Sequence, residues 1–152
     1  TQAARTHRPI GWLAPALGAF PAPRGTAARE ALNRGTAVLE GGEPLVLFPE
    51  GERNDGPVVH PLFDGAAYVA ARAGVPIIPV GIGGSAAVMP RHAKIIRPGK
   101  VCVVIGAPIH VDLAGADDGS ARRVPRAAVK AATEQLSVEL QRLFDAAQAR
   151  VG

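Results

Sequence analysis

The chain has 152 residues, a single-domain size at which folding buries roughly two-thirds of the surface that the unfolded chain exposes. Its 47% apolar and 20% charged residues are typical of a globular domain, and its longest apolar runs are far shorter than the ~20 residues that span a bilayer. The formal net charge of +4 is carried mostly by arginine, which suits a phosphate, a carboxylate or an anionic membrane as partner. Because the basic residues are scattered and only 4% of residues are aromatic, the composition argues against a nucleic-acid partner.

The first part of the chain alternates between strand-like and helical patterns. Residues 10–20 are apolar and interrupted by Gly and Pro, which predicts a short helix or turn leading into a short strand, with Arg24 on the loop after it. The spacing of apolar residues predicts a helix over 26–40, closed by two glycines. The run Leu-Val-Leu-Phe at 45–48 predicts a buried strand that ends in a charged loop.

The alternation continues in the second part. An Ala-rich helix is expected over 65–72, followed by a strand over 75–82 with a bulge or a sheet edge at Pro79. Residues 95–96 are a candidate for a further strand, and the apolar run 101–105 predicts another. Strands that alternate with helices predict an α/β fold with a mostly parallel central sheet flanked by helices.

The end of the chain predicts one long amphipathic helix over about 125–150, with Pro125 well placed in its first turn. Core packing is the usual role of such an apolar stripe, and a helix that lies on a membrane is the less common one. We therefore predict a single domain over residues 1–152. The stripe consists of Val129, Leu136, Leu140, Leu143, Phe144 and Ala147.

The segment that follows the predicted strand 45–48 is the best candidate for a functional site. In open α/β sheets, ligands bind beyond the carboxyl ends of the strands, so Glu50 and Arg53 are expected at the rim of a cleft. Gly51 would let a substrate approach the backbone closely. Taken alone, these residues are more simply interpreted as a β-turn with a solvated charge pair. The segment reads Phe48-Pro49-Glu50-Gly51-Glu52-Arg53.

Other chemistries have little support in the sequence. The run from Gly83 to Ala86 loosely resembles the nucleophile elbow of serine hydrolases, which need an acid and then a His downstream of the Ser. No Asp or Glu lies between Ser85 and His110, and no His follows Asp112, so a serine hydrolase is a remote alternative. The four histidines have no second His or Cys three or four residues away, and no metal is expected.

Three segments, in order, resemble three of the four motif blocks of the glycerolipid acyltransferases, the family of bacterial 1-acylglycerol-3-phosphate acyltransferases. They are Gly18-x-Phe20-Pro21-x-x-Arg24, Phe48-Pro49-Glu50-Gly51-Glu52-Arg53 and Val75-Pro76-Ile77-Ile78-Pro79-Val80. The resemblance extends over residues 9–109. It implies transfer of an acyl group from acyl-carrier protein or acyl-CoA to a lysophospholipid or a glycerol phosphate, with no further cofactor.

The resemblance also implies roles for individual residues. Arg24 and Arg53 match positions that hold the acceptor phosphate, which suits the forked geometry of a guanidinium group. Glu50 and Gly51 match residues that shape the acceptor site. The expected substrate-binding residues are Arg24, Phe48, Pro49, Glu50, Gly51, Glu52 and Arg53.

The sequence departs from the family pattern beside this motif. The family usually has Thr and Ser where this chain has Glu52 and Asn54, and often a Lys near the position of Phe63. A carboxylate next to Arg53 would partly neutralise a phosphate site. The departures put a phosphate-bearing acceptor in question.

The first block of the family is absent from these residues. It reads His-x-x-x-x-Asp, in which the His is the general base and the Asp orients it. The resemblance places this block before Thr1, so we expect the chain to be truncated at its N-terminus and to contain no catalytic residue. The residues five positions after the four histidines are Trp12, Gly65, Arg97 and Gly115.

The sequence thus predicts the acceptor-binding part of an acyltransferase of phospholipid synthesis, located in the cytoplasm and peripheral on the inner face of the cell membrane. Its expected partners are a lysophospholipid, acyl-carrier protein or acyl-CoA, and the membrane surface. The alternative from a different class is a non-catalytic domain that binds anionic lipids. The sequence leaves the acyl donor, the chain length and the oligomeric state open.

Overall fold

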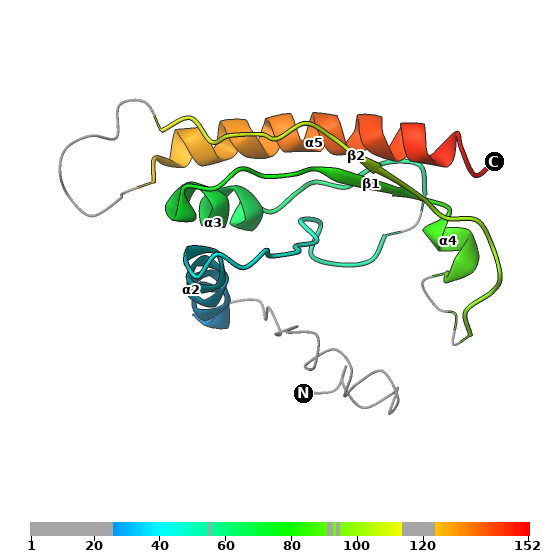
Figure 1. The fold of residues 1–152 in the computed structure, drawn as a ribbon, viewed down its shortest axis with the longest axis horizontal. Helices are drawn as coiled ribbons and strands as arrows, with labels where there is room; N and C mark the ends of the chain where they lie inside the picture. The colour runs from blue at the N-terminus through cyan, green and yellow to red at the C-terminus, as the bar shows by residue number, and fades with distance from the viewer. Residues whose placement is uncertain (1–25, 55, 91–92, 94, 114–123) are drawn as a thin grey trace.

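The computed structural model describes residues 26–54, 56–90, 93, 95–113 and 124–152. Figure 1 shows the longest helix, α5, running along the molecule beside two strands, with α2 and α3 toward one end and α4 toward the other. The element predicted over 10–20, and Arg24, lie outside the described residues. The elements are α2 (Thr26–Glu40), α3 (Gly65–Ala73), β1 (Val80–Gly83), α4 (Ser85–Val88), β2 (Cys102–Ile105) and α5 (Arg126–Gln148).

The three long helices are confirmed, with ends within two residues of the predicted ones. Glycines follow α2 and α3 in the left-handed conformation, with φ of 81° at Gly42 and 69° at Gly74. That conformation turns the chain out of the helix and favours glycine, which has no Cβ. Pro125 directly precedes α5 with φ of −63°, a value that the proline ring imposes.

The sheet of the described residues is a two-stranded antiparallel ladder, so the prediction of a mostly parallel sheet is wrong for this part of the chain. β1 and β2 pair with Val80 opposite Ile105 and Gly83 opposite Cys102. In the described part of the connection between them, the one-turn helix α4 is the single helix. A parallel pair usually needs a longer crossover helix, and this connection instead reverses the direction of the chain.

The predicted irregularity at Pro79 is confirmed. The pairing of the strands resumes beyond the ladder as an isolated bridge between Ile77 and Ile109. Between bridge and ladder, residues 78–79 lie opposite residues 106–108, so one strand carries an extra residue, as in a β-bulge. Proline has no N–H to donate, which interrupts the ladder at this point.

Two predicted strands are not formed in the described residues. The segment 45–48 belongs to no strand, and Val46 and Phe48 are 79% and 76% exposed, so the expectation of a buried strand is wrong. Residues 95–96 are likewise exposed and unpaired. A run of apolar residues indicates that burial would be favourable, but a strand also needs a neighbouring strand to bond with its backbone.

Helix α5 packs directly on one face of the ladder at two glycines of β1. A Cβ added to Gly81 would overlap the backbone of Leu143 and lie 2.6 Å from the amide nitrogen of Phe144. Gly83 meets the next turn of α5 in the same way. The missing side chains therefore let the backbones of helix and strand approach closely.

The core beneath this contact consists of small aliphatic side chains. The predicted stripe of α5 is confirmed, because four of its six residues are buried and the other two are half-buried. No helix within the described ranges is both long and apolar enough to cross a bilayer. The buried apolar residues are Ala67, Val69, Ala70, Ala71, Ile109, Val129, Ala132, Leu136, Leu143 and Ala147.

The other face of the ladder is apolar and exposed. Val80 lies opposite Ile105 and Ile82 lies opposite Val103, and these four side chains are between 37% and 68% exposed. They point away from α5, because successive residues of a strand face opposite sides of the sheet. Within the described residues, the sheet is therefore covered on one face only.

We predict that Gly81→Ala destabilises the protein by about 2 kcal/mol or more, because the new methyl group forces β1 and α5 apart. Thermal or urea unfolding followed by circular dichroism measures the change. Gly65→Ala is the matched control, since its Cβ would lie an ordinary 3.4 Å from Leu32. Equal stability of the two variants would contradict the close backbone contact.

Candidate functional site

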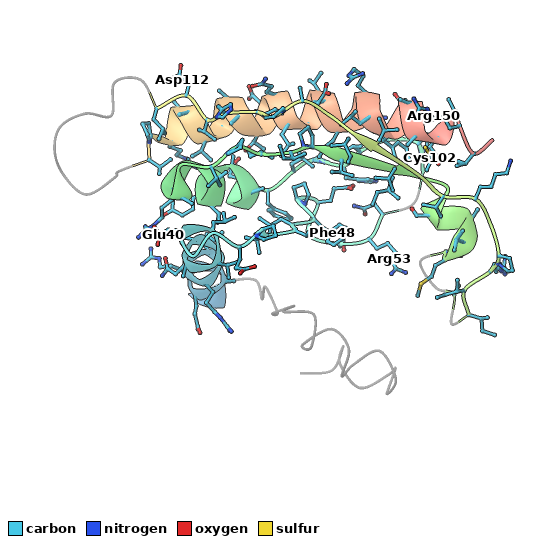
Figure 2. All side chains as sticks on the ribbon, viewed as in Figure 1. Glu40, Phe48, Arg53, Cys102, Asp112 and Arg150 are labelled. Carbon is cyan, nitrogen blue, oxygen red and sulfur yellow. The ribbon has the colours of Figure 1, made fainter. Side chains whose placement is uncertain are left out.

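The predicted motif forms a tight turn on the long loop between α2 and α3. The carbonyl of Phe48 accepts a hydrogen bond from the N–H of Gly51 at 3.0 Å, and Gly51 has φ of 71°. Figure 2 shows Phe48 and Arg53 on this loop, with Arg53 toward the end of the molecule that carries α4. A left-handed residue in a tight turn favours glycine, so the turn explains Gly51 without a ligand.

The ring of Phe63 packs against Gly51. A Cβ at Gly51 would lie 2.6 Å from the ring carbon Cε2 of Phe63, and the N–H of Phe63 donates to the carbonyl of Pro49 at 2.9 Å. Gly51 was expected to let a substrate approach the backbone, but an aromatic side chain of the same loop takes this place. Phe63 stands near the position where the family often has Lys, so here an apolar contact lies beside the motif.

The carboxylate of Glu50 links two other residues of the loop. Its Oε2 atom accepts hydrogen bonds from the side-chain amide of Asn54 at 3.0 Å and from the backbone N–H of His60 at 3.1 Å. Glu50 is half-buried. A carboxylate with two such donors positions the backbone around it, and bonds to a charged group are stronger than neutral ones.

Arg53 differs from Glu50 because it is exposed. Its guanidinium group is therefore accessible to a ligand in solution. Arg24 lies outside the described residues, so the convergence of Arg24 and Arg53 on one anion stays a prediction. Glu52 is also exposed.

A residue that the sequence analysis did not single out ties this loop to the longest helix. The side-chain carbonyl of Gln141 on α5 accepts from the N–H of Val59 at 2.7 Å, and its amide nitrogen donates to the carbonyl of Pro57 at 3.0 Å. The same nitrogen donates to Asp145 at 2.8 Å, which orients the amide. Gln141 lies 82 residues after Val59 in the chain, and no local pattern in the sequence indicates this contact.

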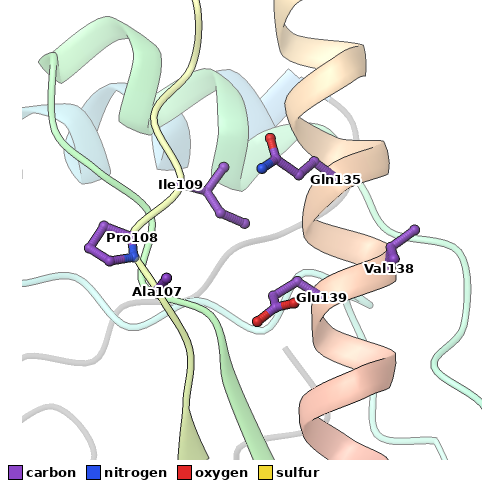
Figure 3. Close-up of a pocket in the computed structure, with 6 residues that line it drawn as sticks. All are labelled: Ala107, Pro108, Ile109, Gln135, Val138 and Glu139. Atoms are coloured by element: carbon purple, nitrogen blue, oxygen red, sulfur yellow. The ribbon is translucent and has the colours of Figure 1, made fainter.

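An open hollow of about 400 Å³ lies between the segment after β2 and α5 (Figure 3). Glu139 at its edge accepts hydrogen bonds of 2.9 and 2.6 Å from Arg142, which lower the pKa of the Glu139 carboxyl below its usual value. None of the predicted site residues lines this hollow. Its lining residues are Ala107, Pro108, Ile109, Gln135, Val138 and Glu139.

The remaining chemistries gain no support from the described residues. Ser85 is exposed at the start of α4, and its side chain forms no hydrogen bond with another described residue. No three His, Cys, Asp or Glu side chains in the described part of the chain are grouped so that they could hold a metal ion. The loop between α2 and α3 that carries the motif, residues 41–64 and called the motif loop below, is therefore the candidate site.

Comparisons with known proteins identify the family of the chain. A family model described as Acyltransferase matches residues 2–83, which include the motif loop. Two chloroplastic 1-acyl-sn-glycerol-3-phosphate acyltransferases are similar over 66% of this chain. BAT2 of Brassica napus is 32% identical and LPAT1 of Arabidopsis thaliana is 33% identical. The chain spans only about 30% of the length of these plant relatives.

A solved structure shows the same fold. The chain is similar to the 1-acyl-sn-glycerophosphate acyltransferase PlsC from Thermotoga maritima, with a TM-score of 0.70 and 21% identity. The match covers 98% of this chain and 55% of that chain. The predicted α/β fold of the glycerolipid-acyltransferase type is confirmed, although the described strands pair antiparallel.

We predict that Gln141→Ala loosens the motif loop without unfolding the domain. The loss of two hydrogen bonds to the backbone should lower the free energy of local opening by about 1–3 kcal/mol. Hydrogen exchange measured by NMR should then show faster exchange at the amides of Val59 and His60. Gln135→Ala on the same helix is the control, because Gln135 is exposed and lies at the hollow. Unchanged exchange at Val59 would show that the loop is held by other contacts.

Proposed function

Since the chain belongs to the acyltransferase family, whose model matches more than half of its residues, we propose that it supplies the acceptor-binding part of an enzyme that acylates lysophosphatidate or a related lysolipid. The acyl group would come from acyl-carrier protein or acyl-CoA. The observation that carries the proposal is the arrangement of the motif loop. Glu50 accepts two hydrogen bonds from other residues of this loop, and Arg53 is exposed. A held backbone with an exposed guanidinium group is suited to binding an anion.

The acceptor phosphate is the proposed ligand of Arg53. A guanidinium group presents two parallel N–H donors to phosphate oxygens, and such charged bonds are the strongest polar contacts available at a surface. By the family resemblance, Arg24 would supply a second guanidinium group. Glu52, one position before Arg53, adds negative charge and would weaken the attraction of a phosphate.

The proposed reaction needs a base that takes the proton of the acceptor hydroxyl. The hydroxyl oxygen then attacks the thioester carbonyl, an ester bond forms, and the thiol of the donor leaves. Arg stays protonated at neutral pH and an unperturbed Glu is a weak base, whereas His is suited to the task. No His-x-x-x-x-Asp block occurs in residues 1–152, so we place the base outside these residues.

A non-catalytic domain that binds anionic lipids is the second candidate. The same absence of a His-x-x-x-x-Asp block favours it. It would use Arg53 in the same way but would transfer no acyl group in any context. Both candidates would work at a membrane, and the inner, cytoplasmic face of the cell membrane remains our proposal for the location.

We predict that Arg53→Gln weakens the binding of glycerol 3-phosphate to the chain by about tenfold or more. Hydrogen bonds to charged groups contribute about 1.5–3 kcal/mol, and 1.4 kcal/mol corresponds to a tenfold change in affinity. NMR titration of the backbone amides of the motif loop would measure the dissociation constant. Arg126→Gln is the control, since Arg126 is an exposed arginine and the first residue of α5. Figure 1 shows the start of α5 at the end of the molecule opposite to α4. Equal losses in both variants would indicate unspecific attraction to a basic protein.

We predict that residues 1–152 alone transfer no acyl group from acyl-CoA or acyl-carrier protein to lysophosphatidate. General-base catalysis contributes about 10²–10⁴-fold to the rate, and the chain lacks the expected base. Thiol release and product formation measure the reaction. A longer polypeptide that includes a His-x-x-x-x-Asp block should be active, and His→Ala in that block should abolish its activity. Thioester-dependent transfer by residues 1–152 would contradict this assignment and redirect attention to His60 or Ser85.

A further inference from the structure

The segment between α4 and β2 exposes neighbouring apolar side chains. Ile95 is 77% exposed, Ile96 is 63% exposed, and Val101 at the far end of the segment is 49% exposed. Single exposed apolar residues are common on proteins, but two adjacent isoleucines on a loop form a contiguous apolar tip. We refer to residues 95–101 as the Ile loop.

Backbone contacts hold the Ile loop against α4. The N–H of Arg97 donates to the carbonyl of Val88 at 2.8 Å, and a Cβ at Gly99 would lie only 2.9 Å from the side chain of Val88. On the other side, Gly84 lies directly against the carbonyl of Lys100. These contacts hold residues 97–100 beside α4 and Gly84.

The Ile loop and the sequence just before it are basic. Arg97 and Lys100 are exposed within the loop. Between Gly84 and Val101, the sequence contains four Lys or Arg residues and no Asp or Glu. An apolar tip beside exposed cations complements the surface of an anionic bilayer, where acyl chains lie beneath negatively charged headgroups.

We propose that the Ile loop docks on an anionic lipid bilayer, with Ile95 and Ile96 entering the boundary between headgroups and acyl chains and with Arg97 and Lys100 contacting lipid phosphates. A protein partner fits less well. A stable protein interface needs about 800 Å² on each side and has few charged residues at its centre, whereas this surface is one short loop that carries two cations.

The location of the Ile loop connects it with the motif loop. Figure 1 places α4 and the segment after it at one end of the molecule, and Figure 2 places Arg53 toward the same end. Docking there would bring Arg53 toward the bilayer in which a lysolipid acceptor is held. This reason for docking rests on the proposed function, but the binding to lipid can be measured without it.

The test is binding of the 152-residue chain to vesicles of phosphatidylglycerol and of phosphatidylcholine, measured by co-sedimentation. We expect binding to phosphatidylglycerol and at least about tenfold weaker binding by Ile95→Ser combined with Ile96→Ser, because two apolar side chains leave the bilayer. Arg97→Gln combined with Lys100→Gln should lower binding about 25-fold, at roughly fivefold for each charge. High salt should reduce the binding of the unaltered chain in the same direction.

Val138→Ser is the matched control. Val138 is 72% exposed on α5 and is not part of the Ile loop, so this variant should bind as the unaltered chain does. Circular dichroism checks that each variant is folded. An equal loss in the Val138 variant, or unchanged binding of both double variants, would overturn the proposal. So would a change in oligomeric state of the isoleucine variant with unchanged vesicle binding, because the loop would then contact a second copy of the chain.

The outcome is separable from that of the proposed function. Binding of soluble glycerol 3-phosphate should be the same in the isoleucine variant and in the unaltered chain. Vesicle binding that depends on the Ile loop, together with no effect of Arg53→Gln on glycerol 3-phosphate, would support the docking surface and reject the acceptor site. Vesicle binding that does not depend on the Ile loop, together with weaker binding of glycerol 3-phosphate by the Arg53→Gln variant, would reject the docking surface alone.

Discussion

The close contact between α5 and β1 is the constraint on which the rest of the described structure depends. It requires Gly81 and Gly83, because any side chain there would meet the backbone of the helix. With the helix in this position, Gln141 reaches the loop before α3 and Gln148 accepts a hydrogen bond from the N–H of Gly84. Helix α5 therefore positions both the candidate site loop and the start of α4. A change in the packing of α5 would shift both segments.

In the motif loop, Glu50 and Arg53 have different roles, although the family resemblance assigns both to the substrate site. Both Glu50 and Arg53 were predicted to bind substrate, but Glu50 is half-buried with two donors on one oxygen, whereas Arg53 is exposed. Glu50 thus stabilises the turn, and Arg53 is the group that can meet a ligand. The packing of Phe63 on Gly51 adds an apolar contact at this point.

Two exposed apolar surfaces in the structure differ in their chemistry. The outer face of the ladder consists of paired aliphatic side chains, and sheets of α/β proteins are usually covered on both faces. The Ile loop, in contrast, places its isoleucines beside exposed cations. This combination of apolar and basic groups suits a charged lipid surface, whereas a purely apolar face suits the packing of further protein.

The sequence by itself determined the three long helices, the irregularity at Pro79 and the family, because these depend on local spacing, on proline chemistry and on short motifs. It could not determine whether the run 45–48 would be buried, since an apolar run indicates a tendency and its burial depends on neighbours far along the chain. The direction of strand pairing and the contact of Gln141 with the motif loop were decided by tertiary structure alone. Both join segments that are distant in sequence, and no local pattern encodes which distant backbone group a strand or a side-chain amide will meet.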